Sequence, residues 1–415
     1  MLYAMSSLPL LLLGLSYVAG ELEIMYQWTL AKFDTPFNYP PNTKYRADTT
    51  FINSVEVGWD RVFVTLPRIW SGNPASLAWV PRPRKGQPND PSPPLQAYPG
   101  WEWHVEAASR NLTKGNCSGL VSVFRARLDR CNRLWVLDSG VQDSLVTFNV
   151  VCPPRIFIFD LRTDQLVRMI TLPNEVLRRN TLLSNMVLDD QSDFQNGGYG
   201  SCDNMFVYMS DTVAPAIVVY DSTRDAAWRL QHPKMYPDPD YGTYTLAGES
   251  FTLMDGILGM ALNPAGSYRR TLFFQPFASD RLFGVPTSAL QRGPNPGDDA
   301  ELPVTLVGHK SSQAAGLAVD IRDGSLVFCP VSETAIAAWQ PGSLDHKVVA
   351  YSPELLQFVL DFRSADRDEG NMWLVSSRFH KYFRRTVNPK EFNIRIMRLT
   401  PEVNHLNSTL FVFKK

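Results

Sequence analysis

The sequence predicts an all-β fold, a six-bladed β-propeller with four-stranded antiparallel blades and a ring closed by pairing of the chain ends. Two observations predict this fold: one strand motif recurs six times at blade-sized intervals, and no segment keeps helical periodicity for more than a few turns. The clearest copy of the motif is NRLWVLDSG at residues 132–140. A polar turn precedes an apolar run that contains an aromatic residue and ends at an acidic one, which is typical of a buried strand between two turns.

Five further copies repeat this pattern less strictly. They begin at Asp60, Asp203, Arg270, Gly324 and Gly370, so that successive copies of the six start 72, 71, 67, 54 and 46 residues apart. A propeller blade takes roughly 40–50 residues. Each copy therefore predicts one strand of one blade, and the longer spacings leave room for rim loops.

The first strand is predicted at residues 24–30, before the Pro-rich segment 34–42, and it has no blade of its own. We therefore expect it to complete the last blade, because closing the ring removes exposed strand edges. The first full blade covers about residues 51–103. It contains seven prolines between residues 81 and 99, which predicts an extended rim loop.

The other five blades are predicted from their apolar strand patterns. Their strands are expected at residues 120–128, 133–137, 155–161 and 165–172; 182–188, 205–210, 216–220 and 227–230; 257–262, 271–277, 281–285 and 304–307; 315–319, 326–331, 335–339 and 348–351; and 357–362, 372–376 and 394–399. Residues 231–249, rich in Pro, Tyr, Gly and Asp, predict a second rim loop. Short helical turns are expected only in loops such as residues 353–356.

Length and charge limit the classes of partner that the protein can have. The chain has 415 residues, enough for one large propeller, with 40 Lys and Arg against 41 Asp and Glu. This balance gives no overall field that favours nucleic acid or an anionic membrane, so neither is expected as a partner. The one basic stretch, residues 378–385, interleaves aromatic residues and is interpreted as an amphipathic strand or loop.

The N-terminus and three sequons predict export. Residues 8–15 form an apolar run of the length of a signal-peptide core, and small residues at 18–20 predict cleavage before Glu21. We expect a signal peptide at 1–20, a single propeller domain at 21–415, and a secreted, extracellular protein with no membrane span. The expected glycosylation sites are Asn111, Asn116 and Asn407.

The five cysteines agree with an oxidising compartment. We predict a disulfide between Cys117 and Cys131 inside one blade, and another between Cys152 and Cys202 that ties neighbouring blades. Cys329 lies in an apolar strand pattern and is expected as a buried free thiol. No CxxC or HExxH spacing occurs, so no metal is predicted, and no dinucleotide or phosphate-binding motif points to a cofactor.

At several blocks the sequence resembles the yellow/major royal jelly protein family of secreted insect proteins. The blocks run in the family's order between about residues 21 and 399: CNRLWVLDSG (131–140), CPPRIFIFDL (152–161), DGILGMALNP (255–264), QAAG (313–316) and GNMWLVS (370–376). The resemblance implies a six-bladed propeller, in agreement with the six motif copies. It implies one of three roles: conversion of dopachrome, binding of biogenic amines at one end of the channel, or pigmentation and hardening of cuticle or eggshell. Residues 60–68 and 97–103 look most like the eggshell-associated branch.

The resemblance also implies a ligand site. In amine-binding relatives the ligand lies against blocks similar to residues 373–379 and 357–362 of this chain. Asn or Asp usually stands where this chain has Ser377, a weaker acceptor, whereas Asp361 offers a carboxylate to an ammonium group. The implied partners are a small aromatic amine, catechol or indole and components of the extracellular matrix. The residues with implied ligand-binding roles are Tyr98, Asp361, Ser377 and Phe379.

Dopachrome isomerisation sets its own chemical requirements. A proton must leave carbon and another must return, so a site needs a general base with a pKa near neutrality and donors for the quinone oxygens. His104 and His380 are candidate bases and Arg378 is a candidate donor, although each also fits a structural or surface role. Arg125, on a predicted innermost strand, is expected either to line the channel and contact a ligand or to form an ion pair with a neighbouring blade.

The preferred interpretation is a secreted, glycosylated propeller that acts in cuticle or eggshell maturation and melanin-type pigmentation by binding phenolic or indole ligands. The alternatives are a dopachrome-converting isomerase and a protein that sequesters biogenic amines.

Overall fold

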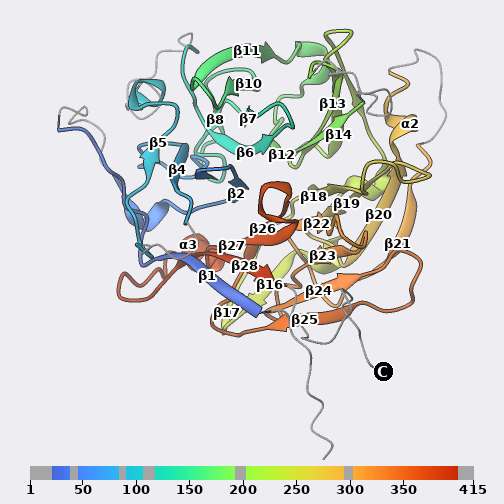
Figure 1. The fold of residues 1–415 in the computed structure, drawn as a ribbon. Helices are drawn as coiled ribbons and strands as arrows, with labels where there is room; N and C mark the ends of the chain where they lie inside the picture. Colours follow the sequence, from blue (N-terminus) through green and yellow to red (C-terminus); the bar gives the residue numbers. More distant parts are fainter. Residues whose placement is uncertain are drawn as a thin grey trace, which may run out of the picture.

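The computed structural model describes residues 21–37, 45–83, 90–105, 117–191, 202–293 and 302–400. Six four-stranded antiparallel sheets stand around a central axis (Figure 1), and the innermost strands of neighbouring sheets contact one another around the ring. The predicted six-bladed propeller is therefore confirmed. The predicted signal peptide and the sequons at Asn111, Asn116 and Asn407 lie outside the described residues.

The blades are numbered in chain order, and their strands run from the innermost to the outermost. Blade 1 is β2 (Ser54–Val57), β3 (Arg61–Thr65), β4 (Leu77–Pro81) and β5 (Gln96–Ala97). Blade 2 is β6 (Val123–Leu128), β7 (Arg133–Asp138), β10 (Arg155–Asp160) and β11 (Gln165–Thr171). Blade 3 is β12 (Leu183–Asp190), β13 (Met205–Asp211), β14 (Ala216–Asp221) and β15 (Ala226–Leu230).

Blade 4 is β18 (Ile257–Leu262), β19 (Thr271–Pro276), β20 (Arg281–Pro286) and β21 (Thr305–His309). Blade 5 is β22 (Leu317–Val319), β23 (Leu326–Phe328), β24 (Ala335–Trp339) and β25 (Lys347–Tyr351). Blade 6 is β26 (Val359–Ala365), β27 (Asn371–Ser376), β28 (Ile394–Thr400) and β1 (Glu21–Trp28).

Two small hairpins and a few short helices lie in the connections. The hairpins are β8 (Val141–Gln142) with β9 (Asn149–Val150) and β16 (Thr243–Leu246) with β17 (Glu249–Thr252). Among the described residues, the helices are α2 (Thr287–Leu290) and α3 (Phe379–Arg384), with 3-10 turns at η1 (Ala47–Thr49), η2 (Trp101–Trp103), η3 (Asn174–Val176), η4 (Pro233–Met235), η5 (Pro239–Tyr241) and η6 (Asp366–Asp368).

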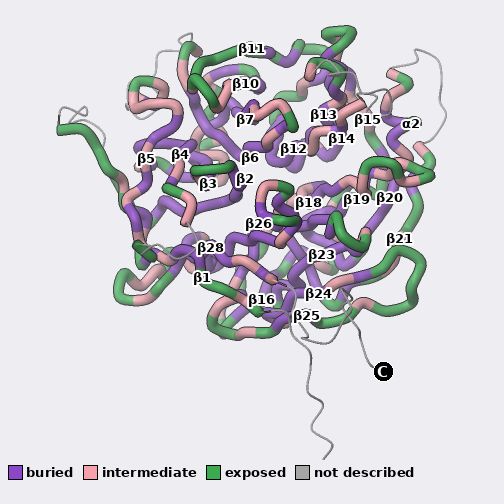
Figure 2. The backbone as a smooth tube through the Cα atoms, in the orientation of Figure 1, coloured by how far each residue is buried: buried purple, intermediate pink, exposed green. Residues whose placement is uncertain are grey.

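Burial follows the position of a strand within its blade. All residues of the second strand β7 (RLWVLD) are buried, because neighbouring blades cover both faces of the sheet. The outermost strand β11 (QLVRMIT) is mostly exposed. Figure 2 shows the same gradient, with buried segments near the axis and exposed ones at the rim. The continuous apolar run in the motif NRLWVLDSG therefore belongs to a strand that is packed on both faces.

The ring closes as predicted, by pairing of the two ends of the described chain. β1 joins β28 in antiparallel register from Glu21 opposite Thr400 to Trp28 opposite Ile394. The indole N–H of Trp28 donates to the carbonyl of Pro93 at 2.8 Å, and the hydroxyl of Tyr26 donates to the carbonyl of Pro81. The first strand is thus held both by blade 6 and by the Pro-rich loop of blade 1.

The predicted rim loop at residues 231–249 is wrong in its second half, because β16 and β17 form a hairpin there. Tyr244, Leu246 and Phe251 are buried while the residues between them are largely exposed, an alternation that defines a strand with one covered face. Ala247 (φ 50°) and Gly248 (φ 81°) make the turn, and two successive residues with positive φ suit a tight hairpin.

The basic stretch is also corrected, because residues 379–384 form the short helix α3 rather than a strand or loop. Arg378 (φ 42°) and Arg385 (φ 62°) have left-handed backbone conformations at its two ends, which set the helix off from the flanking chain. Phe379 and Tyr382 are buried at i,i+3 spacing on one face. Burial of this aromatic face outweighs the low tendency of so short a segment to form a helix.

The disulfide pairing is a third correction. Cys117 joins Cys152, and Cys131 joins Cys202, while Cys329 is the buried free thiol as predicted. Cys117 precedes β6 and Cys131 follows it, and a six-residue strand spans about 20 Å. A disulfide requires Cα atoms within about 7 Å, so the predicted Cys117–Cys131 bridge is impossible in this fold.

Non-reducing peptide mapping is expected to recover a Cys117–Cys152 and a Cys131–Cys202 cross-linked peptide pair. The reason is geometric, since the Cα atoms of these pairs lie 5.9 Å and 6.2 Å apart. Recovery of a Cys117–Cys131 pair from the folded protein would contradict the path of blade 2. Unfolding at mildly acidic pH with N-ethylmaleimide present is the control, because the buried Cys329 thiol is then blocked as soon as it is exposed and cannot exchange with the disulfides.

Candidate ligand-binding site

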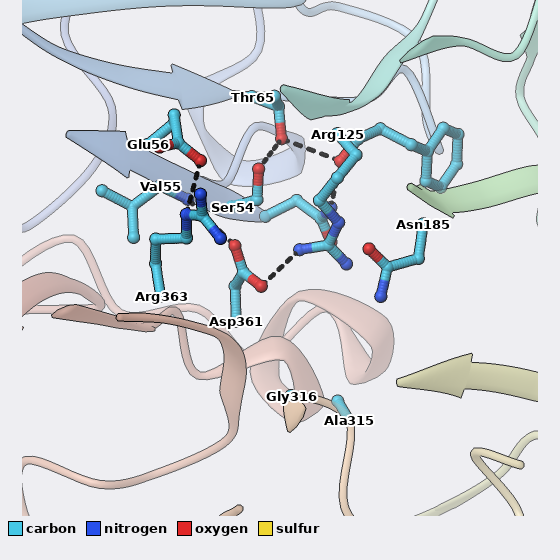
Figure 3. A network of polar contacts seen from close by, with 12 residues as sticks. Ser54, Val55, Glu56, Thr65, Arg125, Asn185, Ala315, Gly316, Asp361 and Arg363 are labelled. Carbon is cyan, nitrogen blue, oxygen red and sulfur yellow. Dashed lines mark hydrogen bonds and ion pairs between the residues drawn. The ribbon is translucent and has the colours of Figure 1, made fainter. Parts of the chain in front are cut away.

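The middle of the channel holds a network of charged side chains that joins blades 1, 2 and 6 (Figure 3). Asp361 on β26 forms ion pairs with Arg125 (2.8 Å) and Arg127 (3.3 Å), both on β6. Its second carboxylate oxygen accepts the backbone N–H of Val55 on β2 at 3.3 Å. The side chains of Arg125 and Asp361 are each only 3% exposed, so this is a buried network.

This network answers the open question about Arg125, which lies in the channel and also forms an ion pair across blades. Asp361 likewise faces the channel, but two guanidinium groups already compensate its charge. A buried carboxylate in such a pair contributes little to capture of an external ammonium. The network therefore positions the three blades relative to one another.

Side-chain amides also connect neighbouring blades, by donating to backbone carbonyls. Asn53 donates to the carbonyl of Phe124 at 2.8 Å, and Asn185, labelled in Figure 3, donates to that of Leu258 at 2.8 Å. Gln275 donates to the carbonyl of Ala314 at 2.9 Å. These bonds satisfy backbone acceptors that the innermost strands leave unpaired beside the channel.

We call the end of the channel where the innermost strands begin the upper mouth, and it is lined by apolar and aromatic side chains. Phe124, Leu182 and Leu360, from blades 2, 3 and 6, belong to one apolar cluster there. The β16–β17 hairpin and α3 contact each other over the mouth, and Lys381 of α3 lies 3.5 Å from Glu249 of the hairpin. The upper mouth thus has a roof on the side of blades 4 to 6.

Aromatic rings fill the space under this roof. Tyr244 stacks on Phe251 with ring centroids 5.0 Å apart and tilts against Phe277 at 4.7 Å. Phe358, just before β26, lies 5.3 Å from Phe379 and 5.9 Å from Phe251. Aromatic rings prefer such edge and offset contacts, and the flat ring of a ligand can form contacts of the same geometries.

Two polar side chains in this aromatic cluster lack partners. The hydroxyl of Tyr244 and both ring nitrogens of His380 are buried and make no hydrogen bond within the described part of the chain. Burial lowers the pKa of His380 to about 4, so its ring is neutral at physiological pH. Burial and the nearby Asp255 carboxylate raise the pKa of Tyr244 well above 10, so its phenol stays protonated. A buried unpaired polar group costs about 1–3 kcal/mol, which a ligand can recover.

Asp255 is the third polar group at the upper mouth. It directly precedes Gly256 and β18, and it neighbours Tyr244 electrostatically. Its side chain has no hydrogen bond or ion pair to any described residue, and burial raises its pKa to about 7. A carboxyl with this pKa is half ionised at neutrality, which is the condition for a general base.

The upper face opens between blades 2 and 3. A cavity of about 660 Å³ lies there, lined by residues 147–150 and by Arg179 and Asn180. Phe148 at its wall also packs against the apolar cluster of the upper mouth. Phe148 thus connects the wall of this cavity to that apolar cluster.

Two predicted site residues lie away from this mouth. Tyr98 is packed between Phe63 (5.1 Å) and Phe159 (5.6 Å) in the core between blades 1 and 2, and its hydroxyl donates to Asp164 at 2.9 Å. His104 is fully buried beside it, with its Nε2 2.9 Å from the Tyr98 carbonyl. Burial and Arg68 lower the pKa of His104 to about 3. Both residues follow the outer strand β5, which explains why they do not reach the channel.

Four predicted residues do lie at the upper mouth, in the segment that joins β27 to α3. Phe379 and His380 belong to the aromatic cluster described above. The Ser377 hydroxyl donates to the carbonyl of Ile52, so it ties blade 6 to blade 1. Arg378 pairs with Glu391 at 2.7 Å, so its charge is balanced within the protein.

The prediction missed Asp255 and Tyr244. Asp255 opens the DGILGMALNP block, but a sequence does not show that a carboxylate lacks a cation. Tyr244 lies in the segment interpreted as a loop, where the alternation of TYTLAGESFT was the signal for a covered hairpin. Asp255 and Tyr244 become site residues through contacts between blades 3, 4 and 6, which a local sequence pattern does not show.

Fold and site together define a β-propeller with a charged, closed channel centre and an aromatic upper mouth. Among the described residues, no group of three or more His, Cys, Asp or Glu side chains is placed to hold a metal ion. Within the same ranges, no helix is long and apolar enough to cross a membrane.

Comparison with known proteins identifies the family. The sequence profile of the major royal jelly proteins matches residues 121–409. A protein of Drosophila melanogaster named dopaminechrome tautomerase is 30% identical, covering 91% of this chain and 82% of its own length. Major royal jelly protein 9 of Apis mellifera is 29% identical over 94% of this chain and 90% of its own length, and protein yellow of D. melanogaster is 29% identical over 92% and 69%.

The chain therefore belongs to the yellow/major royal jelly protein family. Among solved structures, a streptogramin B lyase aligns over 92% of this chain and 98% of its own, with a TM-score of 0.45 and 8% identity. A likeness at that level carries no information about function.

Proposed function

We propose that this protein binds a small phenolic or indole ligand at the upper mouth of its channel and acts outside the cell in cuticle or eggshell maturation and melanin-type pigmentation. The observation that carries this proposal is the pair of unpartnered polar groups, on Tyr244 and His380, inside a cluster of aromatic rings. A flat ring with hydroxyl or N–H substituents matches both features at once. The two disulfides support an extracellular setting, since such bonds persist in oxidising compartments.

A second candidate function is tautomerisation of an aminochrome, and Asp255 is the observation that favours it. A tautomerase must remove a proton from one atom of its substrate and return one to another. Asp255 offers a carboxyl with a pKa near neutrality beside a protonated phenol, Tyr244. A relative that is 30% identical carries the name dopaminechrome tautomerase.

Sequestration of a biogenic amine, the other alternative, has less support at the position implied by the resemblance. Asp361 is paired with Arg125 and Arg127, so an ammonium would depend on the ionised form of Asp255 instead. Calorimetry with dopamine at pH 6 and pH 8 tests this. Amine capture at Asp255 requires tighter binding at pH 8, where the carboxylate is ionised.

Binding of 5-hydroxyindole is expected to weaken about 5- to 10-fold in Tyr244→Phe, measured by isothermal titration calorimetry. The substitution removes one hydrogen-bonding hydroxyl, worth about 1 kcal/mol, and keeps the ring. Because this hydroxyl has no partner in the free protein, the midpoint of thermal unfolding is expected not to fall. Tyr351→Phe, at a tyrosine that is 66% exposed on β25, is the matched control. Equal affinity in all three proteins, or no binding by the wild type, would place the site elsewhere.

A further inference from the structure

The opposite end of the channel holds a second cavity, which the proposed function does not use. It has a volume of about 240 Å³ and lies where the innermost strands β2, β6 and β26 end. We call this end the lower mouth. At roughly 30 Å³ per water molecule, the volume corresponds to a small organic molecule. Its walls include the acidic residues Glu56, Asp129 and Asp366, three arginines and Trp59.

Most charges around the lower mouth are already paired. Glu56 lies 2.8 Å from Arg363, and Asp129 lies 2.7 Å from Arg133. Arg130 lies 2.7 Å from Asp190. These pairs leave the acidic wall residues Glu56 and Asp129 compensated, and the remaining one, Asp366, is exposed to solvent, which screens its charge.

Arg367 is the exception among these arginines. Its Nη2 donates to a backbone carbonyl, that of Asp129, at 3.1 Å, and its Nη1 is buried without a hydrogen-bond partner in the described part of the chain. No carboxylate of the described residues lies within ion-pair distance of it. Burial lowers the pKa of Arg367 more than the acids nearby raise it. The acids nearby therefore only partly compensate the desolvation of this guanidinium.

Trp59 adds a flat apolar surface beside this guanidinium. Its side chain is 67% exposed in the turn between β2 and β3, and the Arg367 guanidinium lies 5.6 Å from its ring centroid. A large aromatic residue exposed at the edge of a cavity is available for stacking. A guanidinium that has no carboxylate within ion-pair distance and lies over an exposed indole is suited to a planar aromatic carboxylate.

We propose that the lower mouth binds a small aromatic carboxylate, with the anion on Arg367 and the ring against Trp59. This assignment is independent of the upper mouth, because it uses no residue of the aromatic cluster.

The test compares two probes that differ only in charge, indole-2-carboxylate and its neutral amide, indole-2-carboxamide. Isothermal titration calorimetry with the full chain is expected to show at least 10-fold tighter binding of the carboxylate. Arg367→Gln is expected to reduce the carboxylate affinity at least 10-fold and to make the two probes equal. Trp59→Ala, at an exposed position that does not endanger folding, is expected to weaken both probes several-fold.

Two control variants separate the lower mouth from other sites. Arg269→Gln removes an exposed arginine in the β18–β19 connection, on the same face but outside the cavity, and Tyr244→Phe alters only the upper mouth. Both are expected to bind indole-2-carboxylate like the wild type. Equal affinity for the two probes, an unchanged affinity in both Arg367→Gln and Trp59→Ala, a loss in Tyr244→Phe, or no binding at millimolar probe would overturn the proposal.

Discussion

Asp255→Asn is expected to slow the conversion of dopaminechrome, the reaction class of the second proposed function, by about 100-fold or more. General acid–base catalysis by a positioned side chain contributes about 10²- to 10⁴-fold, and Asn has nearly the same shape but accepts no proton. The measurement is the decay of dopaminechrome absorbance with purified protein. Asp345→Asn, at an exposed aspartate in a loop of blade 5, is the matched control and is expected to be fully active.

The pH dependence provides a second readout for the same residue. The pKa of Asp255 is raised to about 7, so the basic form accumulates as pH rises through 7. We expect kcat/KM of the wild type to rise between pH 6 and 8 and then to level off. If kcat/KM does not change between pH 6 and 8, or if Asp255→Asn is as active as Asp345→Asn, then Asp255 is not the general base. No acceleration by the wild type would remove the catalytic function while leaving ligand binding open to its own test.

The stability of the folded protein is expected to fall as pH rises, whereas kcat/KM is expected to rise. The pKa of Asp255 is higher in the folded protein than its ordinary value of 3.8, so the folded state holds the proton more tightly than the unfolded chain. Stability is therefore lost as pH rises from about 4 to about 7. Because Asn does not titrate, Asp255→Asn is expected to unfold at a higher temperature than wild type at pH 8, with little difference at pH 4.

Asp361→Asn is expected to lower the free energy of unfolding by about 3–5 kcal/mol, the typical cost of leaving a buried charge without its partner. Asp361 pairs with Arg125 and Arg127, and its side chain is 3% exposed. The amide keeps the shape but leaves Arg125 without a carboxylate partner at the junction of blades 1, 2 and 6, and it leaves Arg127 with only Glu56, at 3.7 Å. Denaturant unfolding measures the effect.

Asp345→Asn serves again as the control for this substitution and is expected to change the free energy of unfolding by less than about 0.5 kcal/mol. If Asp361→Asn is as stable as this control, the network at the centre of the channel does not hold the blades together. The result would then favour the role implied by the family resemblance, in which the Asp361 carboxylate binds the ammonium group of a ligand.

Much of the fold was predictable because the propeller repeats one local pattern. The run RLWVLD is buried on both faces, and each blade has such a strand, so the apolar motif recurs. The isolated strand near Glu21 predicted ring closure, since an unpaired edge needs a partner. These inferences need only local periodicity and the rule that strand edges are covered.

The site was less predictable because its residues are defined by contacts across blades. The hairpin with Tyr244 and the helix with Phe379 lie in connections, where local pattern competes with tertiary packing. The disulfide pairing depends on which ends of β6 the cysteines occupy. Asp255 gains its raised pKa from burial without a cation, which no sequence motif records.

A crystal structure of the protein soaked with 5-hydroxyindole tests the central claim most directly. We expect the indole ring at the upper mouth, among Tyr244, Phe251 and Phe358, with polar contacts to Tyr244 or His380. A ligand bound only at the lower mouth or on the outer rim would contradict the claim. So would an upper mouth still filled by its own side chains at a concentration that saturates binding in solution.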